Sequence, residues 1–110
     1  MKYLLGIDFG GGASKATLLN QDGKIMATNT TEYKTYYPKP GWSEQNPDDW
    51  VDATIQNIAG VLKKSGINPQ DICAVSLDAA THTAVIMDED FNVIRPAIYW
   101  TDTRSVDEVK

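Results

Sequence analysis

Hydrophobic positions in the first third of the chain predict three short strands. Residues 2–9 (KYLLGIDF) form a nearly continuous apolar run, which is typical of a strand that is covered on both faces. Residues 13–20 and 24–31 follow, and Asp22-Gly23 between them is a strong hairpin signal because both residues can adopt positive φ. Three consecutive strands joined by tight loops predict an antiparallel meander.

Apolar residues recur at helical spacing after residue 46. Asn46 is a good N-cap, Pro47 suits the first helical position, and the acidic Asp48 and Asp49 stand at the positive end of the helix dipole. Gly66 is expected to end this helix. The apolar residues between these ends are expected to form one stripe that packs on the sheet: Trp50, Val51, Ile55, Ile58, Val61 and Leu62.

The segments on either side of this helix are more varied. Residues 33–46 are predicted to be a loop, because Pro38, Pro40 and Gly41 interrupt regular structure. The aromatic residues expected to pin this loop to the body of the domain are Tyr36, Tyr37 and Trp42. After the helix we expect a strand over 72–78, a hairpin of strands 83–88 and 92–95, and the start of another helix at 105–110.

The order of these elements favours an α/β domain. In the order β-β-β-α-β, the fourth strand is reached through a crossover helix, and such a strand usually returns parallel to its neighbour in the sheet. The sequence therefore predicts a mixed sheet with helical cover.

Length and composition fit one globular domain. The chain has 110 residues, of which 42% are hydrophobic and 23% charged. The net charge of −5 argues against nucleic acid and an anionic membrane as partners. Cys73 is the one cysteine, so no internal disulfide can form and a reducing compartment fits best. Its place in the apolar run ICAVSL predicts a buried structural thiol.

The apolar runs are all short. None approaches the roughly 20 residues of a membrane span, and Asp8 interrupts the first run too early for a signal peptide. A cytoplasmic protein is therefore expected. Because residues 105–110 (SVDEVK) read as the beginning of a helix, we expect the chain to be a domain from a longer protein.

The stretch GIDFGGGASK places a glycine turn between the first two strands. A Walker A loop is excluded because Lys15 follows Ser14 rather than glycine. The dinucleotide fingerprint is excluded because the third place after Gly12 is Lys15 and not glycine, and because a strand rather than a helix follows. Backbone N–H groups of such a turn can hold an anion, Asp8 can hold a hydrated Mg²⁺, and Lys15 can add positive charge. A glycine-rich hairpin without a ligand is an equally good interpretation.

Two further polar segments are candidates for ligand binding. The stretch SLDAATHTAV places Thr81 and His82 just past a strand end, where α/β domains collect ligands, although a lone histidine can also be structural. In YWTDTR, Trp100, Asp102 and Arg104 alternate, so on an extended segment they share one face. An aromatic ring beside a carboxylate and a guanidinium suits a polyhydroxylated ligand. The alternative is a surface salt bridge beside an anchoring tryptophan.

Three segments together resemble the N-terminal part of the FGGY carbohydrate kinases, most closely the xylulokinases and related pentulose kinases. They are LGIDFGGGASKATLLNQDGKI, PGWSEQNPDDW and RPAIYWTDTR, in the family's order, and the resemblance runs along essentially the whole chain. It implies a ribonuclease-H-like (actin-like ATPase) fold.

The resemblance also implies a reaction and its site. MgATP would phosphorylate a sugar hydroxyl, with D-xylulose or a related ketopentose as the expected substrate, and a homodimer is compatible with the family. The positions that match its first phosphate loop are Asp8, Gly10, Gly11, Gly12, Ser14 and Lys15, with Asp8 facing the magnesium ion through water. Those that match its sugar cleft are Thr81, His82, Trp100, Asp102 and Arg104.

The chain departs from the family in two places. Members usually carry Thr or Ser where this chain has Gly11 and Gly12, and Gly-Gln-Met where it has Ala79, Ala80 and Thr81. The family's catalytic aspartate and most of its adenine site would lie downstream of residue 110, so the chain alone is expected to be inactive. The alternatives are a non-catalytic sugar- or nucleotide-binding module, a purely structural domain, or a kinase for ribulose, gluconate or glycerol.

Overall fold

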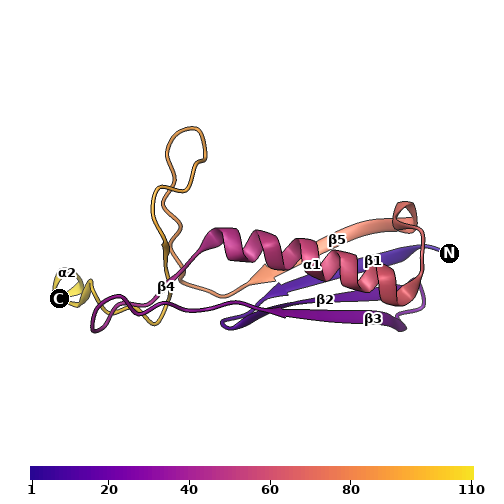
Figure 1. The fold of residues 1–110 in the computed structure, drawn as a ribbon, viewed down its shortest axis with the longest axis horizontal. Coiled ribbons are helices and arrows are strands. Elements are labelled where there is room, and N and C mark those ends of the chain that lie inside the picture. Colours follow the sequence, from indigo (N-terminus) through magenta and orange to yellow (C-terminus); the bar gives the residue numbers. More distant parts are fainter.

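The computed structural model describes residues 1–110 and contains a four-stranded sheet in the order β3-β2-β1-β5. Its strands are β1 (Tyr3–Phe9), β2 (Ala13–Asn20), β3 (Ile25–Glu32) and β5 (Ile72–Ala79). The first three pair antiparallel, whereas β5 lies parallel to β1, so the predicted mixed sheet is confirmed. Helix α1 (Pro47–Ser65) runs along one face of this sheet (Figure 1).

Helix α1 begins and ends where the sequence predicts. The side chain of Asn46 accepts a hydrogen bond from the N–H of Asp48, and Pro47 occupies the first turn. Gly66 ends the helix with φ of 68°, a left-handed conformation that glycine adopts without steric cost. No helix of the structure is both long and apolar enough to cross a membrane.

The turn between β2 and β3 differs in detail from the prediction. Only Gly23 has a positive φ, of 82°, and Asp22 does not. The side chain of Asn20 accepts hydrogen bonds from the N–H groups of Asp22 and Lys24, each at 2.9 Å. An asparagine-capped turn with one left-handed glycine therefore replaces the turn with two positive φ values.

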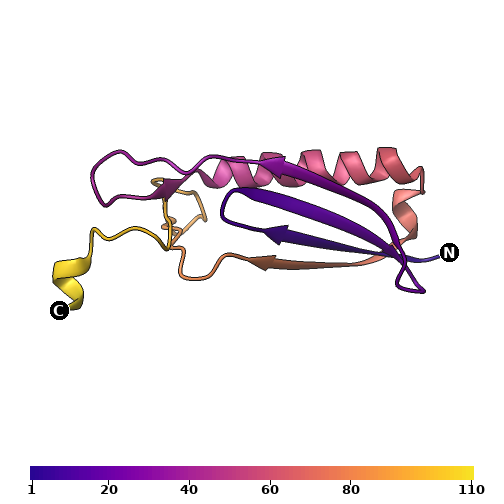
Figure 2. The same ribbon diagram turned by 90° about the horizontal axis from the view of Figure 1, so that it is seen from below.

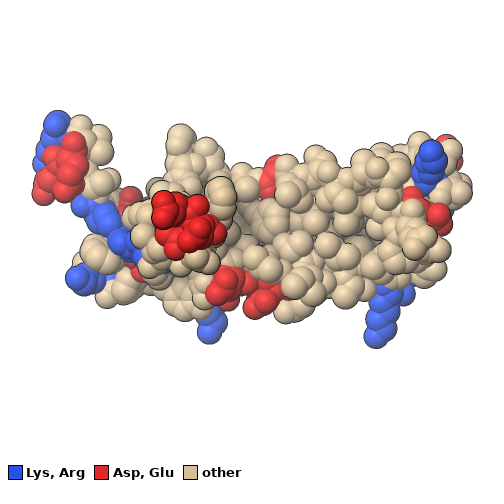
Figure 3. All heavy atoms as spheres, turned by 90° about the horizontal axis from the view of Figure 1, so that it is seen from above, with Lys and Arg blue, Asp and Glu red and all other residues tan.

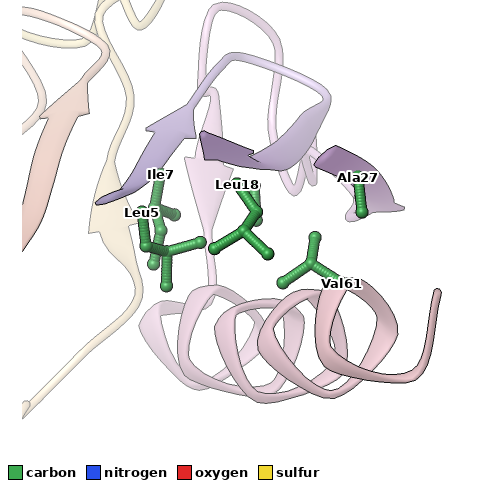
Figure 4. Packing of buried hydrophobic residues seen from close by; sticks show 6 residues of the cluster. Leu5, Ile7, Leu18, Ala27 and Val61 are labelled. Atoms are coloured by element: carbon green, nitrogen blue, oxygen red, sulfur yellow. The ribbon is translucent and has the colours of Figure 1, made fainter. Parts of the chain in front are cut away.

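The hydrophobic core lies between α1 and one face of the sheet. Leu5 and Ile7 of β1, Leu18 of β2 and Ala27 of β3 point toward Val61 of the helix (Figure 4). The other face of β1 is open, with Leu4 at 41% exposure, so the expectation that this strand is covered on both faces is wrong for this structure. Cys73 of the edge strand β5 is likewise exposed rather than buried.

The stripe through which the helix packs matches the prediction only in part, because Val61 is buried and Ile58 packs against the core as expected. Its buried residues are Ala53, Asn57 and Val61, spaced four apart, whereas Val51 and Ile55 are 58% and 62% exposed. The buried amide oxygen of Asn57 accepts hydrogen bonds from Asn29 Nδ2 at 3.0 Å and Thr31 Oγ1 at 2.7 Å. A polar contact between helix and sheet therefore stands where a hydrophobic one was expected.

A second, small sheet lies beyond one end of the main sheet, in a molecule that measures 54 × 27 × 22 Å (Figure 2). It pairs β4 (Glu44–Gln45) with β6 (Ala97–Ile98), and isolated bridges add Tyr36 beside Glu44 and Ala84 beside Ile98. The region 33–46, predicted to be only a loop, thus contributes a strand. Tyr36 and Tyr37 are exposed, so they do not pin it, whereas Trp42 is half-buried.

The remaining elements are short. A 3₁₀ turn (Pro69–Asp71) leads into β5, and α2 (Val106–Val109) is the last helix. The predicted hairpin after β5 is present as a turn over 88–92 with a single bridge between Met87 and Val93, not as two regular strands. Charged side chains gather mainly toward the ends of the molecule, whereas much of the middle of the face shown in Figure 3 is uncharged.

Candidate phosphate and sugar site

The glycine turn between β1 and β2 has its carbonyl groups held by the protein. The Tyr33 hydroxyl donates to the Gly10 oxygen, Gln45 Nε2 donates to the Gly11 oxygen at 2.8 Å, and the Tyr33 N–H donates to the Gly12 oxygen at 3.1 Å. The N–H groups of Gly11 and Gly12 donate to no protein acceptor. Two adjacent free donors with their carbonyls turned into the protein make a concavity suited to an anion.

Gln45 ties this turn to the beginning of α1. Its side chain is buried at 2% exposure, and its Oε1 accepts a hydrogen bond from Trp50 Nε1 at 3.0 Å. Its Nε2 also donates to Thr35 Oγ1 at 3.0 Å. One side chain thus fixes the turn against the helix and the preceding loop.

Asp8, Lys15 and Asp78 form a row on the open face of the sheet. Asp8 is the register partner of Lys15 on β2 and of Asp78 on β5. The pKa of Asp8 is raised, first by a hydrogen bond with the Asp78 carboxyl, then by partial burial and by the negative charge of Asp78, while Lys15 lowers it. The three side chains line a depression of about 260 Å³. Two adjacent carboxylates are a donor set that fits a hard divalent cation.

Ser14 lies on the other face of the sheet. It is fully buried at 0% exposure on the helix side, and its hydroxyl has no hydrogen-bond partner. Side chains alternate across a strand, so Ser14 and Lys15 point in opposite directions. The expectation that Ser14 shares the phosphate site is therefore not met.

His82 and Trp100 lie on the two segments that a bridge of the small sheet joins. Ala84 and Ile98 form an antiparallel bridge, with both hydrogen bonds at 2.9 Å, and each of the two site residues stands two positions from it. His82 is exposed and has a φ of 56°, which is uncommon outside glycine and often marks a functional turn. Trp100 is 56% exposed. Thr81 is exposed as well, so all three side chains are open to solvent.

Asp102 and Arg104 are engaged with the protein itself. The Asp102 carboxylate accepts hydrogen bonds from the Ser43 N–H at 2.8 Å and from Arg104 Nη2 at 2.7 Å. Arg104 Nη2 also donates to Glu44 Oε2 at 2.7 Å, and the guanidinium lies 3.6 Å from the centre of the Trp42 ring. The Arg104 hydrogen bonds lower the pKa of Asp102 to about 2.

A turn explains why these two residues do not face a ligand beside Trp100. The Asp102 N–H donates to the Tyr99 oxygen at 2.9 Å, so the chain bends here instead of extending. Trp100 therefore stays exposed while the Asp102 side chain is only 3% exposed. The prediction that all three share one face is wrong. The alternative of a surface salt bridge beside an anchoring Trp100 is not met either, because the ion pair is buried and stacks on Trp42.

Sequence reasoning missed three residues that surround the glycine turn. Tyr33 and Gln45 hold its carbonyl groups, and the Tyr99 ring lies against Gly11. Burial raises the pKa of Tyr33 to about 12, with smaller contributions from Asp8 and Tyr99. Gln45 lies inside the recognisable segment PGWSEQNPDDW, which was a usable signal, whereas no local pattern pointed to Tyr33.

Known proteins share this arrangement of elements. The pattern of the "FGGY family of carbohydrate kinases, N-terminal domain" matches residues 3–110. The xylulose kinase of Bacillus subtilis is 43% identical over 105 residues, which are 96% of this chain and 21% of that kinase. The glycerol kinase of Thermoanaerobacter sp. is 36% identical over 113 residues, covering 99% of this chain and 23% of that kinase.

A solved structure confirms the fold. The crystal structure of a xyloylose kinase from Brucella ovis superposes with a TM-score of 0.89 at 32% identity, covering 96% of this chain and 22% of that one. The chain spans about a fifth of the length of the relatives it matches. The expected ribonuclease-H-like sheet is thus confirmed, and the chain belongs to the FGGY family of carbohydrate kinases, through that family's N-terminal domain.

Proposed function

We propose that the longer protein that carries this chain transfers a phosphoryl group from MgATP to a sugar hydroxyl, with D-xylulose or a related ketopentose as the acceptor. The observation that carries the proposal is the glycine turn, whose three carbonyls are held by the protein while the N–H groups of Gly11 and Gly12 stay free. Phosphoryl transfer depends mainly on positioning and charge stabilisation, which such a turn provides.

The nucleotide side of the proposed site comprises the glycine turn and the side chains of Asp8, Lys15 and Asp78 on the open face of the sheet. Gly10, Gly11 and Gly12 offer backbone to the phosphates, and Lys15 adds a positive charge. Asp8, through water, and Asp78 beside it would hold Mg²⁺, which when bound neutralises phosphate charge. The proposal omits Ser14, because its hydroxyl is enclosed on the helix side of the sheet.

The sugar side comprises Thr81, His82 and Trp100. An exposed indole can pack on the C–H face of a sugar, and the His82 imidazole and the Thr81 hydroxyl can bond its hydroxyls. Asp102 and Arg104 act indirectly in this proposal, by fixing the turn that presents Trp100. The xylulose kinase of Bacillus subtilis, at 43% identity, supports a ketopentose as substrate.

Residues 1–110 form the N-terminal part of the first kinase domain in this proposal. The short fraction of the relatives that the chain covers supports a longer protein, as does the exposed apolar surface of β5, where Val75 and Leu77 are 57% and 63% exposed. The catalytic base and the adenine site are assigned downstream of residue 110. A cytoplasmic location, the homodimer and the absence of a nucleic-acid partner remain predictions.

A coupled ADP-release assay tests the proposal on the complete protein. We expect turnover with MgATP and D-xylulose above that with D-ribulose, gluconate or glycerol. Asp8→Ala should abolish it, whereas Asp22→Ala in the distant β2–β3 turn should not. Residues 1–110 alone should be inactive, and turnover by them would refute the downstream base. Nucleotide binding without turnover by the complete protein would instead indicate a binding module.

A further inference from the structure

The Tyr99 side chain occupies the space that a side chain at residue 11 would fill. A Cβ added to Gly11 would lie 2.3 Å from the Tyr99 hydroxyl oxygen and 3.4 Å from the carbon that bears it. The φ of Gly11 lies outside the positive range in which glycine is required; Gly23, Gly41 and Gly66 are the glycines inside it. Gly11 is therefore needed for the space that it leaves to Tyr99, and not for the shape of the turn.

The backbone and packing of Tyr99 hold its ring in place. The residue is buried at 9% exposure directly after β6, its N–H donates to the Ser43 oxygen at 2.9 Å, and its oxygen accepts from Asp102 at 2.9 Å. These bonds attach Tyr99 to the loop of β4 and to the ion-pair cluster of Asp102, Arg104 and Glu44. These contacts fix the position of the Tyr99 hydroxyl beside the glycine turn.

The Tyr99 hydroxyl is free to bind a ligand there. It makes no hydrogen bond to the protein, although the neighbouring Tyr33 hydroxyl donates to the Gly10 oxygen. Tyr99, Tyr33 and Gly10 line a cavity of about 510 Å³. Next to Gly10 along the chain, the N–H groups of Gly11 and Gly12 have no acceptor, and the turn itself carries no hydroxyl at either position.

We propose that Tyr99 is a phosphate-binding residue, whose hydroxyl supplies the donor that the side chain of Gly11 lacks. The inference rests on the proposed function. The hydroxyl donates to a phosphate oxygen of the nucleotide, next to the oxygens held by the Gly11 and Gly12 N–H groups. Because Trp100 follows directly, with the two ring centres 5.9 Å apart, the same short segment contacts the phosphate and the sugar.

Calorimetric titration of the complete protein with MgADP tests the ligand role. Tyr99→Phe removes only the hydroxyl, so the Kd for MgADP should rise roughly tenfold, the loss expected for one hydrogen bond to a charged group, with no change in thermal midpoint. Tyr37→Phe, at a 71% exposed tyrosine, is the matched control and should leave Kd unchanged. An unchanged Kd for Tyr99→Phe would overturn the inference.

A double-mutant cycle tests the contact without using activity. Gly11→Ala should lower the thermal midpoint in the wild-type background and much less in the Tyr99→Phe background, where the atom at 2.3 Å is absent. Equal effects in both backgrounds would show that Tyr99 does not occupy this space and would overturn the inference. If wild-type protein binds no MgADP, the proposed function fails and the ligand role with it, while the cycle still reports on the contact.

Discussion

Asp8 and Asp78 stand side by side at matching positions of the parallel strands β1 and β5. The pKa of Asp8 is raised, chiefly by hydrogen bonding with the Asp78 carboxyl, then by desolvation and by the negative charge of Asp78. The strand register alone creates the pair, since the two residues are seventy positions apart in the sequence. Both residues therefore affect the pH dependence of the site.

We predict that Mg²⁺ affinity rises with pH as Asp8 ionises, at a higher pH than for an unperturbed aspartate. Cation binding requires the ionised carboxyl and releases its proton. Asp78→Asn removes the main cause of the raised pKa, so the rise should move to lower pH. Titration of the complete protein with MgADP across a pH series measures this, and identical pH profiles for the two proteins would contradict it.

The same pair has a predicted effect on stability without metal. A carboxyl whose pKa is raised in the folded state contributes stability at low pH, and this contribution is lost as the pH rises through the raised value. Asp78→Asn should therefore raise the thermal midpoint of metal-free protein at neutral pH, whereas exposed Asp107→Asn should not.

Gln45→Ala should destabilise the glycine turn. It leaves the Gly11 oxygen and Trp50 Nε1 without partners, which costs about 2–3 kcal/mol in the free energy of unfolding. The Kd for MgADP should also rise, because the turn is no longer fixed. Denaturant unfolding measures the first effect, with Gln56→Ala on the exposed side of α1 as control. A fully stable variant would show that Gln45 is dispensable.

Arg104→Leu should be costly because it leaves the buried Glu44 and Asp102 carboxylates without that partner. Breaking a buried pair in this way costs about 3–5 kcal/mol. Arg104→Lys should recover only part of this, since an ammonium group cannot bond both carboxylates in the same flat geometry and stack on Trp42. Arg95 also pairs with Glu44, but its side chain is 35% exposed, so Arg95→Leu should lower the free energy of unfolding less than Arg104→Leu does.

Sugar kinetics provide a separate test of this cluster. In the proposed site Arg104 supports the turn that presents Trp100, so Arg104→Lys should raise the KM for the sugar more than it lowers kcat. Trp100 should at the same time become more accessible to a fluorescence quencher, with Trp42→Phe and Trp50→Phe used to isolate its signal. Unchanged KM would show that the cluster does not position the ring.

Acid should weaken the Asp102–Arg104 ion pair and so lower the stability of the folded protein. The folded pKa of Asp102 is about 2, below the value of about 4 for an unfolded aspartate. The stabilisation is therefore complete above about pH 4 and is lost as the pH falls toward 2. The difference in thermal midpoint between wild type and Asp102→Asn should shrink from pH 6 to about pH 3. A difference independent of pH would contradict this.

Gly60→Ala should destabilise the protein although alanine favours helices. An added Cβ would lie 2.4 Å from the side chain of Asn29 on β3, which itself bonds Asn57. In an Asn29→Ala background the clash is absent, and Gly60→Ala should stabilise by up to about 1 kcal/mol, the intrinsic helix preference. Thermal unfolding of the four proteins measures the sign change, and stabilisation in both backgrounds would exclude the clash.

Local chemistry explains what the sequence alone determined. The caps at Asn46 and Gly66 and the three-strand meander follow from short-range rules, the parallel return of β5 follows from the crossover rule, and each is present in the structure. The family could also be identified from short segments, because PGWSEQNPDDW and RPAIYWTDTR are continuous in the chain. Asp8 and Lys15 were recognisable in the same way, and the strand register confirms that they are neighbours.

Only the tertiary structure decided which groups face one another. The choice of Asn57 rather than Ile55 for the helix interface depends on the rotation of α1 against β3, which a hydrophobic pattern does not specify. The withdrawal of Asp102 and Arg104 from the surface depends on Ser43 and Glu44, about sixty residues earlier in the chain. The space at Gly11 depends on Tyr99 in the same way, because contacts between distant segments form only when the chain has folded.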